Sequence, residues 1–313
     1  MLQETLAPAD ALQLRRAKLE GGAFLLPPRL LLRLSGDDAF RYLNGQITRD
    51  LGRLADGHAL AACILTPKGK LSAPLLIWCE KDDLIVESDP SLAETLIARL
   101  ERYIVADNVS VIKEPAPPTI HLFGKLAQTE PWVSAPGIRV NRLGTPGHDL
   151  RDLKDLGEDF PGVALLPRLD ARVIETLRIE RGIPAWGSEL TEETLPPEAG
   201  LDRTHIDYDR GCYPGQEVIS RLKSIGRVNR LLTLLTAPEN TPLAPGHEVL
   251  TEEGTVGTIT SVAPRLTGAG EPVVVHALAY LKRSAVESEV SLFAFDPLTG
   301  GKTKLSIIQV TGS

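Results

Sequence analysis

Arg210-Gly211-Cys212-Tyr213-Pro214-Gly215-Gln216-Glu217, followed by Arg221, is the stretch of this chain that constrains its structure and function most. Two glycines and a proline so close together exclude the interior of a helix and predict a tight turn. The turn presents a cysteine between two arginines, and a thiolate beside cations is a good nucleophile and metal ligand. A turn around a buried, inert cysteine fits the same residues, because free cysteine is among the most buried residue types.

The composition is that of an ordinary folded protein, with 42% hydrophobic and 24% charged residues among 313. A net charge of −7 argues against broad nucleic-acid binding, so no direct nucleic-acid partner is expected. Cys63, Cys79 and Cys212 have neither disulfide nor zinc-site spacing, which suits a reducing cytoplasm and no permanently bound metal. No apolar run approaches the ~18 residues that span a bilayer, so we expect a cytoplasmic protein without a membrane partner.

Apolar runs in the first third of the chain predict an antiparallel α+β layer with helices on one face. The predicted strands are residues 29–34, 59–65, 71–79, 84–88 and 109–113, and the predicted helices follow residues 35–38 and span residues 91–104. Pro74 indicates an edge or a bulge in the third of these strands. Cys63 and Cys79 lie within apolar strands, so we expect both thiols in the core.

Two further units are predicted beyond the proline-rich residues 115–118. The second unit has a strand at residues 119–124 and a helix at residues 171–182 that ends at a glycine. From about residue 230, six short β-rich runs separated by glycine and proline predict a small barrel or sandwich. We therefore expect domains at residues 1–115, 116–228 and 229–313.

Segments around the turn carry a resemblance to a known family. LRIERGIPAWGSEL (177–190), LPPEAGLD (195–202) and RGCYPGQEVISR (210–221) resemble the YgfZ family, the folate-binding relatives of the glycine-cleavage T-protein, an aminomethyltransferase. Arg210 replaces the lysine of the usual signature and keeps its positive charge. Residues 35–51 and 65–78 resemble the family's N-terminal block and the hairpin that follows it.

The resemblance implies an α+β, T-protein-like fold. In that fold, three subdomains form a ring around a folate-sized hole, with ferredoxin-like α+β units and a small C-terminal β-barrel. The resemblance also implies a protein that binds tetrahydrofolate or a derivative and supports iron–sulfur cluster assembly or repair. Its partners would then be folate and iron–sulfur client or assembly proteins, which in bacteria include radical enzymes that modify tRNA.

By the same resemblance, Cys212 is the functional thiol, either as a nucleophile or as one ligand of a transient cluster. Gln216 is expected to hydrogen-bond to the backbone, and Glu217 to pair with Arg210 or Arg221. Roles in setting the loop and roles in chemistry are equally open for Tyr213, Gln216 and Glu217. The motif residues besides Cys212 are Arg210, Gly211, Tyr213, Gly215, Gln216, Glu217 and Arg221.

The candidate folate contacts are Arg29, Gln46, Ile174, Arg178 and Glu180. Glu180 and Arg178 share a helix, where a carboxylate can accept hydrogen bonds from the aminopyrimidine of a pterin or close a salt-bridged helix end. Ile174 falls where T-proteins carry a folate-binding arginine and some YgfZ relatives a tryptophan, and Arg29 falls on a second such tryptophan position. We therefore expect altered folate contacts, with Arg29 able to pair with a folate carboxylate.

The hairpin at residues 65–78 departs from the T-proteins, which carry two aspartates where this chain has Ala73 and Pro74. Neither side chain can take or stabilise a proton, so aminomethyl transfer is not expected. Two alternatives stay open: a one-carbon transferase with another amine or thiol substrate, and a noncatalytic folate-binding scaffold for client proteins. Lys68 and Lys70 suit a solvated turn or a site for a polyglutamate tail or a phosphate. The polar tract at residues 202–209 is expected to be a solvated loop.

Overall fold

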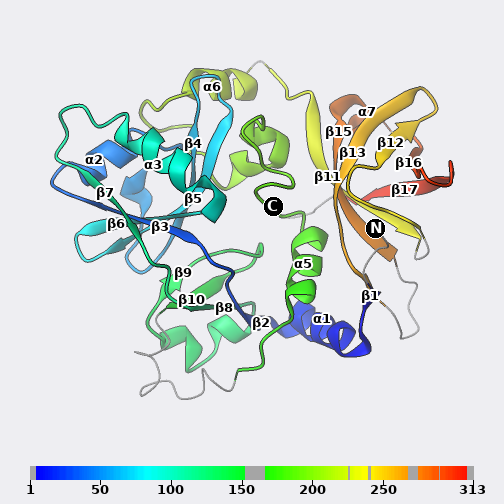
Figure 1. The fold of residues 1–313 in the computed structure, drawn as a ribbon, viewed down its shortest axis with the longest axis horizontal. Helices are drawn as coiled ribbons and strands as arrows, with labels where there is room; N and C mark the ends of the chain where they lie inside the picture. The colour runs from blue at the N-terminus through cyan, green and yellow to red at the C-terminus, as the bar shows by residue number, and fades with distance from the viewer. Residues whose placement is uncertain are drawn as a thin grey trace.

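The computed structural model describes residues 5–151, 166–224, 226–238, 241–266, 274–288 and 290–308. Its elements form three units (Figure 1): a five-stranded sheet at upper left, a four-stranded sheet below it and a closed barrel at right. This α+β architecture with a C-terminal barrel confirms the predicted fold class. Over the described residues, no helix combines the length and the apolar character that a membrane crossing requires.

The five-stranded sheet contains all the strands predicted for the first third of the chain. Its antiparallel order is β4-β5-β6-β3-β7. The bounds are β3 Leu30–Ser35, β4 Leu60–Leu65, β5 Leu71–Glu80, β6 Asp83–Ser88, β7 Ser110–Glu114, α2 Ala39–Asn44 and α3 Ala93–Glu101. Leu43 of α2 and Leu100 of α3 pack with Leu32 of β3 in one buried cluster. Pro74 lies beyond the part of β5 that pairs with β6 and beside a register shift in β4, as expected of a proline.

The four-stranded sheet joins the N-terminal end of the described chain to its middle, in the order β2-β8-β10-β9. The bounds are α1 Pro8–Glu20, β2 Gly22–Leu25, β8 Thr119–Phe123, β9 Ile138–Arg139, β10 Gly147–Arg151 and α5 Ala171–Glu180. Leu14 of α1 and Leu177 of α5 pack with Phe123 of β8, so both helices contact the same face. The sequence did not predict β2, which pairs with β8 across the expected boundary at residue 115. The three domain ranges stay a prediction.

The barrel closes in the order β11-β15-β13-β12-β16-β17, and its six strands coincide with the six predicted runs. The bounds are β11 Arg230–Pro238, β12 Glu248–Thr251, β13 Gly254–Val262, β15 Val274–Lys282, β16 Leu292–Phe295, β17 Lys302–Ile308 and α7 Arg283–Glu287. Leu235, Val249 and Leu281 are fully buried in its core. The short strand β1 (Thr5–Leu6) pairs in parallel with β14 (Arg265–Leu266), which brings the start of the described chain beside the barrel unit.

Candidate functional site

The signature turn packs against the hairpin between β4 and β5, where α6 (Gln216–Ser224) lies at the top of Figure 1. Gly215 has φ +86° immediately before the helix, a conformation that side chains rarely adopt. A Cβ at Gly215 would lie 2.5 Å from the carbonyl oxygen of Thr66, and one at Gly69 would lie 2.9 Å from Val218. The two backbones therefore approach closely only because both positions lack a side chain.

Arg210 fastens the turn to the segment that follows α2. Its Nη1 donates hydrogen bonds to the carbonyl oxygens of Ile47 at 3.0 Å and Arg49 at 2.5 Å. Its Nη2 donates to the carbonyl oxygen of Asn44 at 2.6 Å. Burial lowers the pKa of Arg210, against the raising effect of nearby acidic groups. Since a guanidinium has five donors in a rigid fork, one side chain here satisfies three backbone carbonyls.

The residues after Cys212 complete the anchoring of the turn. Tyr213 is buried, and the Arg210 guanidinium lies 5.4 Å from the centre of its ring. Burial raises the pKa of Tyr213 to about 12. Gln216 donates to the carbonyl oxygen of Arg210 at 3.3 Å, which is the backbone contact predicted for it. Glu217 pairs with Arg221 at 3.0 Å, and both side chains are exposed.

The three cysteines have different environments. Cys212 and the neighbouring Gly211 are exposed at the tip of the turn. Cys63 is fully buried, as expected, and burial raises the pKa of its thiol. The prediction that Cys79 is a core residue was wrong, since it is exposed near the end of β5. An exposed thiol on an anchored turn is accessible to another molecule, whereas a thiol such as Cys63 is not.

Sequence reasoning missed Asp207, which was expected in a solvated loop but is 7% exposed. Its carboxylate accepts from Arg49 Nε at 3.2 Å, Arg53 Nη1 at 3.1 Å and the backbone N–H of Asp50 at 3.0 Å. The side chain of His205 in the same tract is half-buried, and desolvation lowers its pKa to about 4. Asp207 resembles any other acid in a polar tract, and its partners lie far away in the sequence.

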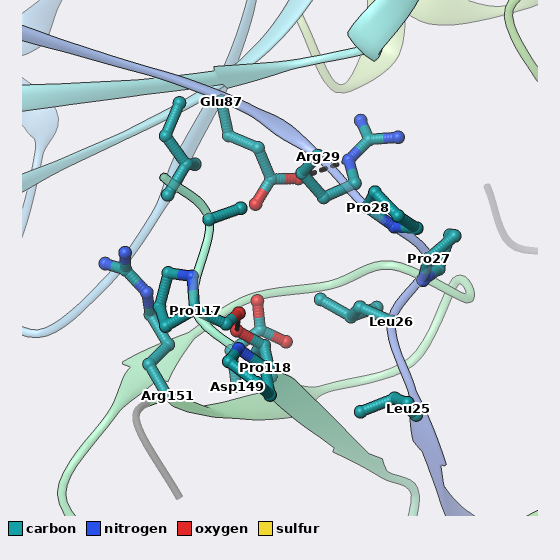
Figure 2. A pocket seen from close by; sticks show the side chains of 13 residues that line it. Leu25, Leu26, Pro27, Pro28, Arg29, Glu87, Pro117, Pro118, Asp149 and Arg151 are labelled. Carbon is teal, nitrogen blue, oxygen red and sulfur yellow. Dashed lines mark hydrogen bonds and ion pairs between the residues drawn. The ribbon is translucent and has the colours of Figure 1, made fainter. Parts of the chain in front are cut away.

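A cavity of about 280 Å³ opens between the five-stranded and four-stranded sheets. Its walls come from the connections between β2 and β3 and between β7 and β8, and from β6 and β10. In Figure 2, the carboxylates of Glu87 and Asp149 point toward this space from opposite sides. Arg29 also lines the cavity, and its Nε donates to Glu87 at 3.0 Å (dashed in Figure 2).

Arg142 holds both of these carboxylates and thereby joins the two sheets. It donates to the two oxygens of Glu87 at 2.7 Å and to Asp149 at 2.6 Å, and its side chain is 11% exposed. Burial works against the charge of Arg142, but the two carboxylates raise its pKa above the ordinary value. Burial would raise the pKa of Asp149, yet Arg142 and His121, whose Nδ1 lies 2.7 Å away, lower it overall. Sequence reasoning missed this cluster, because Arg142 lies in the bend before β10 and its partner Glu87 comes from β6 of the other sheet, 55 residues away.

The two charged folate candidates on α5 are engaged in ion pairs. Arg178 donates to the buried Glu189 at 2.9 Å. Both oxygens of Glu180 accept from Lys18 of α1, at 2.6 and 2.9 Å, and His276 Nδ1 lies 3.4 Å away. This is the salt-bridged helix end that the sequence left as the alternative to pterin binding.

The remaining candidates also lie apart. Gln46 accepts from Arg99 Nη1 at 3.0 Å, and Ile174 packs against the cluster between α1, α5 and β8. Of the five candidate folate residues, Arg29 lines the cavity of Figure 2, and the other four are absent from its described lining. The described structure therefore does not gather the five side chains in that one cavity.

The hairpin between β4 and β5 contains Ala73, which stands where the T-proteins have an aspartate, and the candidate cation Lys70. Ala73 is fully buried on the core face of β5. Lys70 pairs with Glu193, so this lysine is not a free cation in the described structure. Within the described ranges, no group of three or more His, Cys, Asp or Glu side chains is arranged to hold a metal ion.

Comparison with known proteins agrees with this architecture. No protein-family model matches the chain. The tRNA-modifying protein YgfZ of Yersinia pseudotuberculosis is 27% identical over 240 residues, which cover 70% of this chain and 72% of the relative. A chloroplastic protein of Arabidopsis thaliana, named as a transferase, is 25% identical over 81% of this chain, which spans 63% of that relative's length.

The fold itself matches a solved structure. The glycine cleavage system aminomethyltransferase T from Bartonella henselae superposes with a TM-score of 0.78 at 18% identity. The match covers 98% of this chain and 91% of that protein. The structural match shows a T-protein-like fold, and the sequence relative supports the YgfZ family for this chain.

Proposed function

We propose that this protein acts in tRNA modification as a YgfZ-like, folate-binding protein and uses Cys212 as its functional thiol. The support comes from a relative named as tRNA-modifying and from the T-protein-like fold. One observation carries the role of Cys212: the half-buried guanidinium of Arg210 and the buried ring of Tyr213 hold the turn, while the thiol between them is exposed. The three cysteines are free, which suits the cytoplasm as the proposed compartment.

In this proposal, Cys212 supports the assembly or repair of iron–sulfur enzymes that modify tRNA. A lone thiol supplies one ligand at most, whereas an iron–sulfur cluster is usually held by four. The other ligands would come from the client or from an assembly protein, with the cluster as cargo. The exposed position of Cys212 is compatible with such a shared ligand set.

The cavity beside Arg29 fits part of a folate. Its volume of about 280 Å³ lies near the lower end of small-molecule pockets. The Arg29 side chain is 27% exposed, uses its Nε on Glu87 and has its Nη1 4.0 Å from Asp89, so Nη2 is the donor most compatible with a ligand carboxylate. Glu180 does not fit a pterin contact while Lys18 occupies both carboxylate oxygens.

Tetrahydrofolate supplies a one-carbon carrier when it is bound. In this chain, Ala73 and Pro74 provide no group that moves a proton where the T-proteins have two aspartates. The lack of a proton-transferring group at Ala73 and Pro74 therefore supports a folate-binding role without aminomethyl transfer.

Replacing Cys212 with alanine is expected to abolish tRNA modification while leaving the fold intact, because the thiol is exposed. The variant is expressed in a bacterial strain that lacks its own YgfZ protein, and modified nucleosides in tRNA are quantified by mass spectrometry. Thermal unfolding should change by no more than about 0.5 kcal/mol. Cys79→Ala is the matched control, since it removes an exposed thiol elsewhere. Full modification with Cys212→Ala would refute the role of the thiol.

Tetrahydrofolate and 5-formyltetrahydrofolate are expected to bind with a micromolar Kd, about −8 kcal/mol, in anaerobic calorimetry. Arg29→Ala should weaken binding about tenfold or more, because it removes a charged donor from the cavity wall. Lys113→Ala, which removes an exposed cation from β7, serves as the control. Absence of binding to the unmodified protein counts against the folate role, and unchanged binding by Arg29→Ala counts against this cavity.

A further inference from the structure

Two side chains, Arg210 in the signature turn and Asp207 just before it, each tie this part of the chain to the segment at residues 44–53. Arg210 supplies the first tie, through the backbone carbonyls described above. Asp207 supplies the second tie, through the side chains of Arg49 and Arg53 and the N–H of Asp50. The two ties lie just before Cys212 and on the same partner segment, so together they restrict how the turn can move.

The Asp207 tie is charged and desolvated. Its carboxylate is 7% exposed, whereas the Arg49 and Arg53 side chains are 24% and 47% exposed. Hydrogen bonds to an ionised, poorly hydrated carboxylate are stronger than those between neutral groups. Among the described residues, Asp207 is the one acceptor that these three donors share, so its removal loosens all three contacts at once. The position of the tract relative to residues 49–53 therefore depends on Asp207 more than on either arginine.

The backbone of Asp207 and of His205 also hydrogen-bonds to this segment, through Thr48. The N–H of Asp207 donates to the carbonyl oxygen of Thr48 at 3.0 Å. The hydroxyl of Thr48 donates to the carbonyl oxygen of His205 at 2.5 Å and accepts from the N–H of Cys63 in β4 at 2.8 Å. The tract before the signature turn is therefore connected to the buried strand β4, which gives the turn a rigid reference.

We infer that Asp207 is a positioning residue that fixes the Cys212 turn relative to residues 44–53. This inference rests on the proposed function of Cys212, because the position of the thiol matters only if the thiol acts. Asp207 does not contact Cys212 itself and works through Arg49, Arg53 and Asp50. The neighbouring Asp209 has a different role, since its side chain is 74% exposed and pairs with Arg53 alone among the contacts described.

Hydrogen exchange of the backbone amides tests the inference directly. Asp207→Ala should speed exchange at the amides of residues 207 and 216, which donate to the carbonyl oxygens of Thr48 and Tyr213, by about tenfold or more, the effect of losing one charge-assisted hydrogen bond. Exchange within β5 serves as an internal reference and should stay unchanged. Asp207→Asn keeps one acceptor oxygen and should fall between the unmodified protein and Asp207→Ala. Asp209→Ala is the matched control and should leave the exchange unchanged.

The same variants are assayed for tRNA modification in the strain that lacks YgfZ. We expect modification to decrease in the order unmodified protein, Asp207→Asn, Asp207→Ala, in parallel with amide protection. Unchanged exchange at the amides of residues 207 and 216 in Asp207→Ala would overturn the inference. A loosened turn with normal modification would also overturn it, provided that Cys212→Ala is inactive. If Cys212→Ala is fully active, the proposed function fails, and the exchange result alone decides whether Asp207 positions the turn.

Discussion

Replacing Arg142 with methionine is expected to destabilise the protein by about 3–5 kcal/mol at neutral pH, as is typical when one partner of a buried ion cluster is removed. The variant leaves Glu87 and Asp149 buried, each at most 4% exposed, and among the described residues their remaining partners are Arg29 on Glu87 and His121 on Asp149. Denaturant unfolding at pH 7.5 measures the loss. Arg41→Met is the control, because Arg41 also pairs with two carboxylates but is 70% exposed. The control should lose no more than about 1 kcal/mol.

The destabilisation caused by Arg142→Met should depend on pH, because the charges of Asp149 and His121 do. In the unmodified protein the folded-state pKa of Asp149 is lowered, so its contribution is present above the unfolded pKa of about 3.9 and is lost as the pH falls through the folded value. Without Arg142, burial dominates and the folded-state pKa of Asp149 rises. Arg142 also helps to lower the pKa of His121, so its removal makes His121 easier to protonate.

In the variant, a proton taken up by Asp149 or His121 relieves the buried charge. The difference in unfolding free energy between Arg142→Met and the unmodified protein should therefore shrink between pH 7.5 and pH 5. A difference no larger than that of Arg41→Met, or one that grows as the pH falls, would contradict the role assigned to the cluster.

The parts of the fold that the sequence predicted depend on local patterns. The six barrel strands alternate with glycine and proline turns, and the five strands of the first sheet are continuous apolar runs, so both are visible within short windows. Strand β2 is only four residues long and is stabilised by pairing with β8, about a hundred residues away, so no local pattern marks it.

The errors in the site have the same origin. Cys79 lies in an apolar strand, but the end of β5 is not covered as its middle is, and periodicity does not show where coverage ends. Asp207 and Arg142 are charged residues whose ion-pair partners lie far away in the sequence. Asp207 pairs with Arg49, and Arg142 pairs with Glu87. The turn at Cys212 was predictable because glycine and proline restrict the backbone at their own positions.

Replacing Gly215 with alanine is expected to destabilise the protein by about 2–5 kcal/mol, through left-handed backbone strain and overpacking together. Residue 215 has φ +86°, and the new Cβ would lie 2.5 Å from the carbonyl oxygen of Thr66, which is backbone and cannot rotate away. Relief of the clash requires the signature turn to separate from the β4–β5 hairpin. Thermal and denaturant unfolding measure the loss.

Gly211→Ala is the matched control within the same turn. A Cβ at Gly211 meets no described atom within 4 Å, and its φ lies outside the left-handed region, so the change should stay within about 0.5 kcal/mol. Equal destabilisation by the two substitutions would contradict the close approach of turn and hairpin. Gly215→Ala should also lower tRNA modification, because it displaces the turn that carries Cys212. Since Gly211→Ala preserves stability, any loss of modification in that variant reports contact between another molecule and the bare backbone beside the thiol.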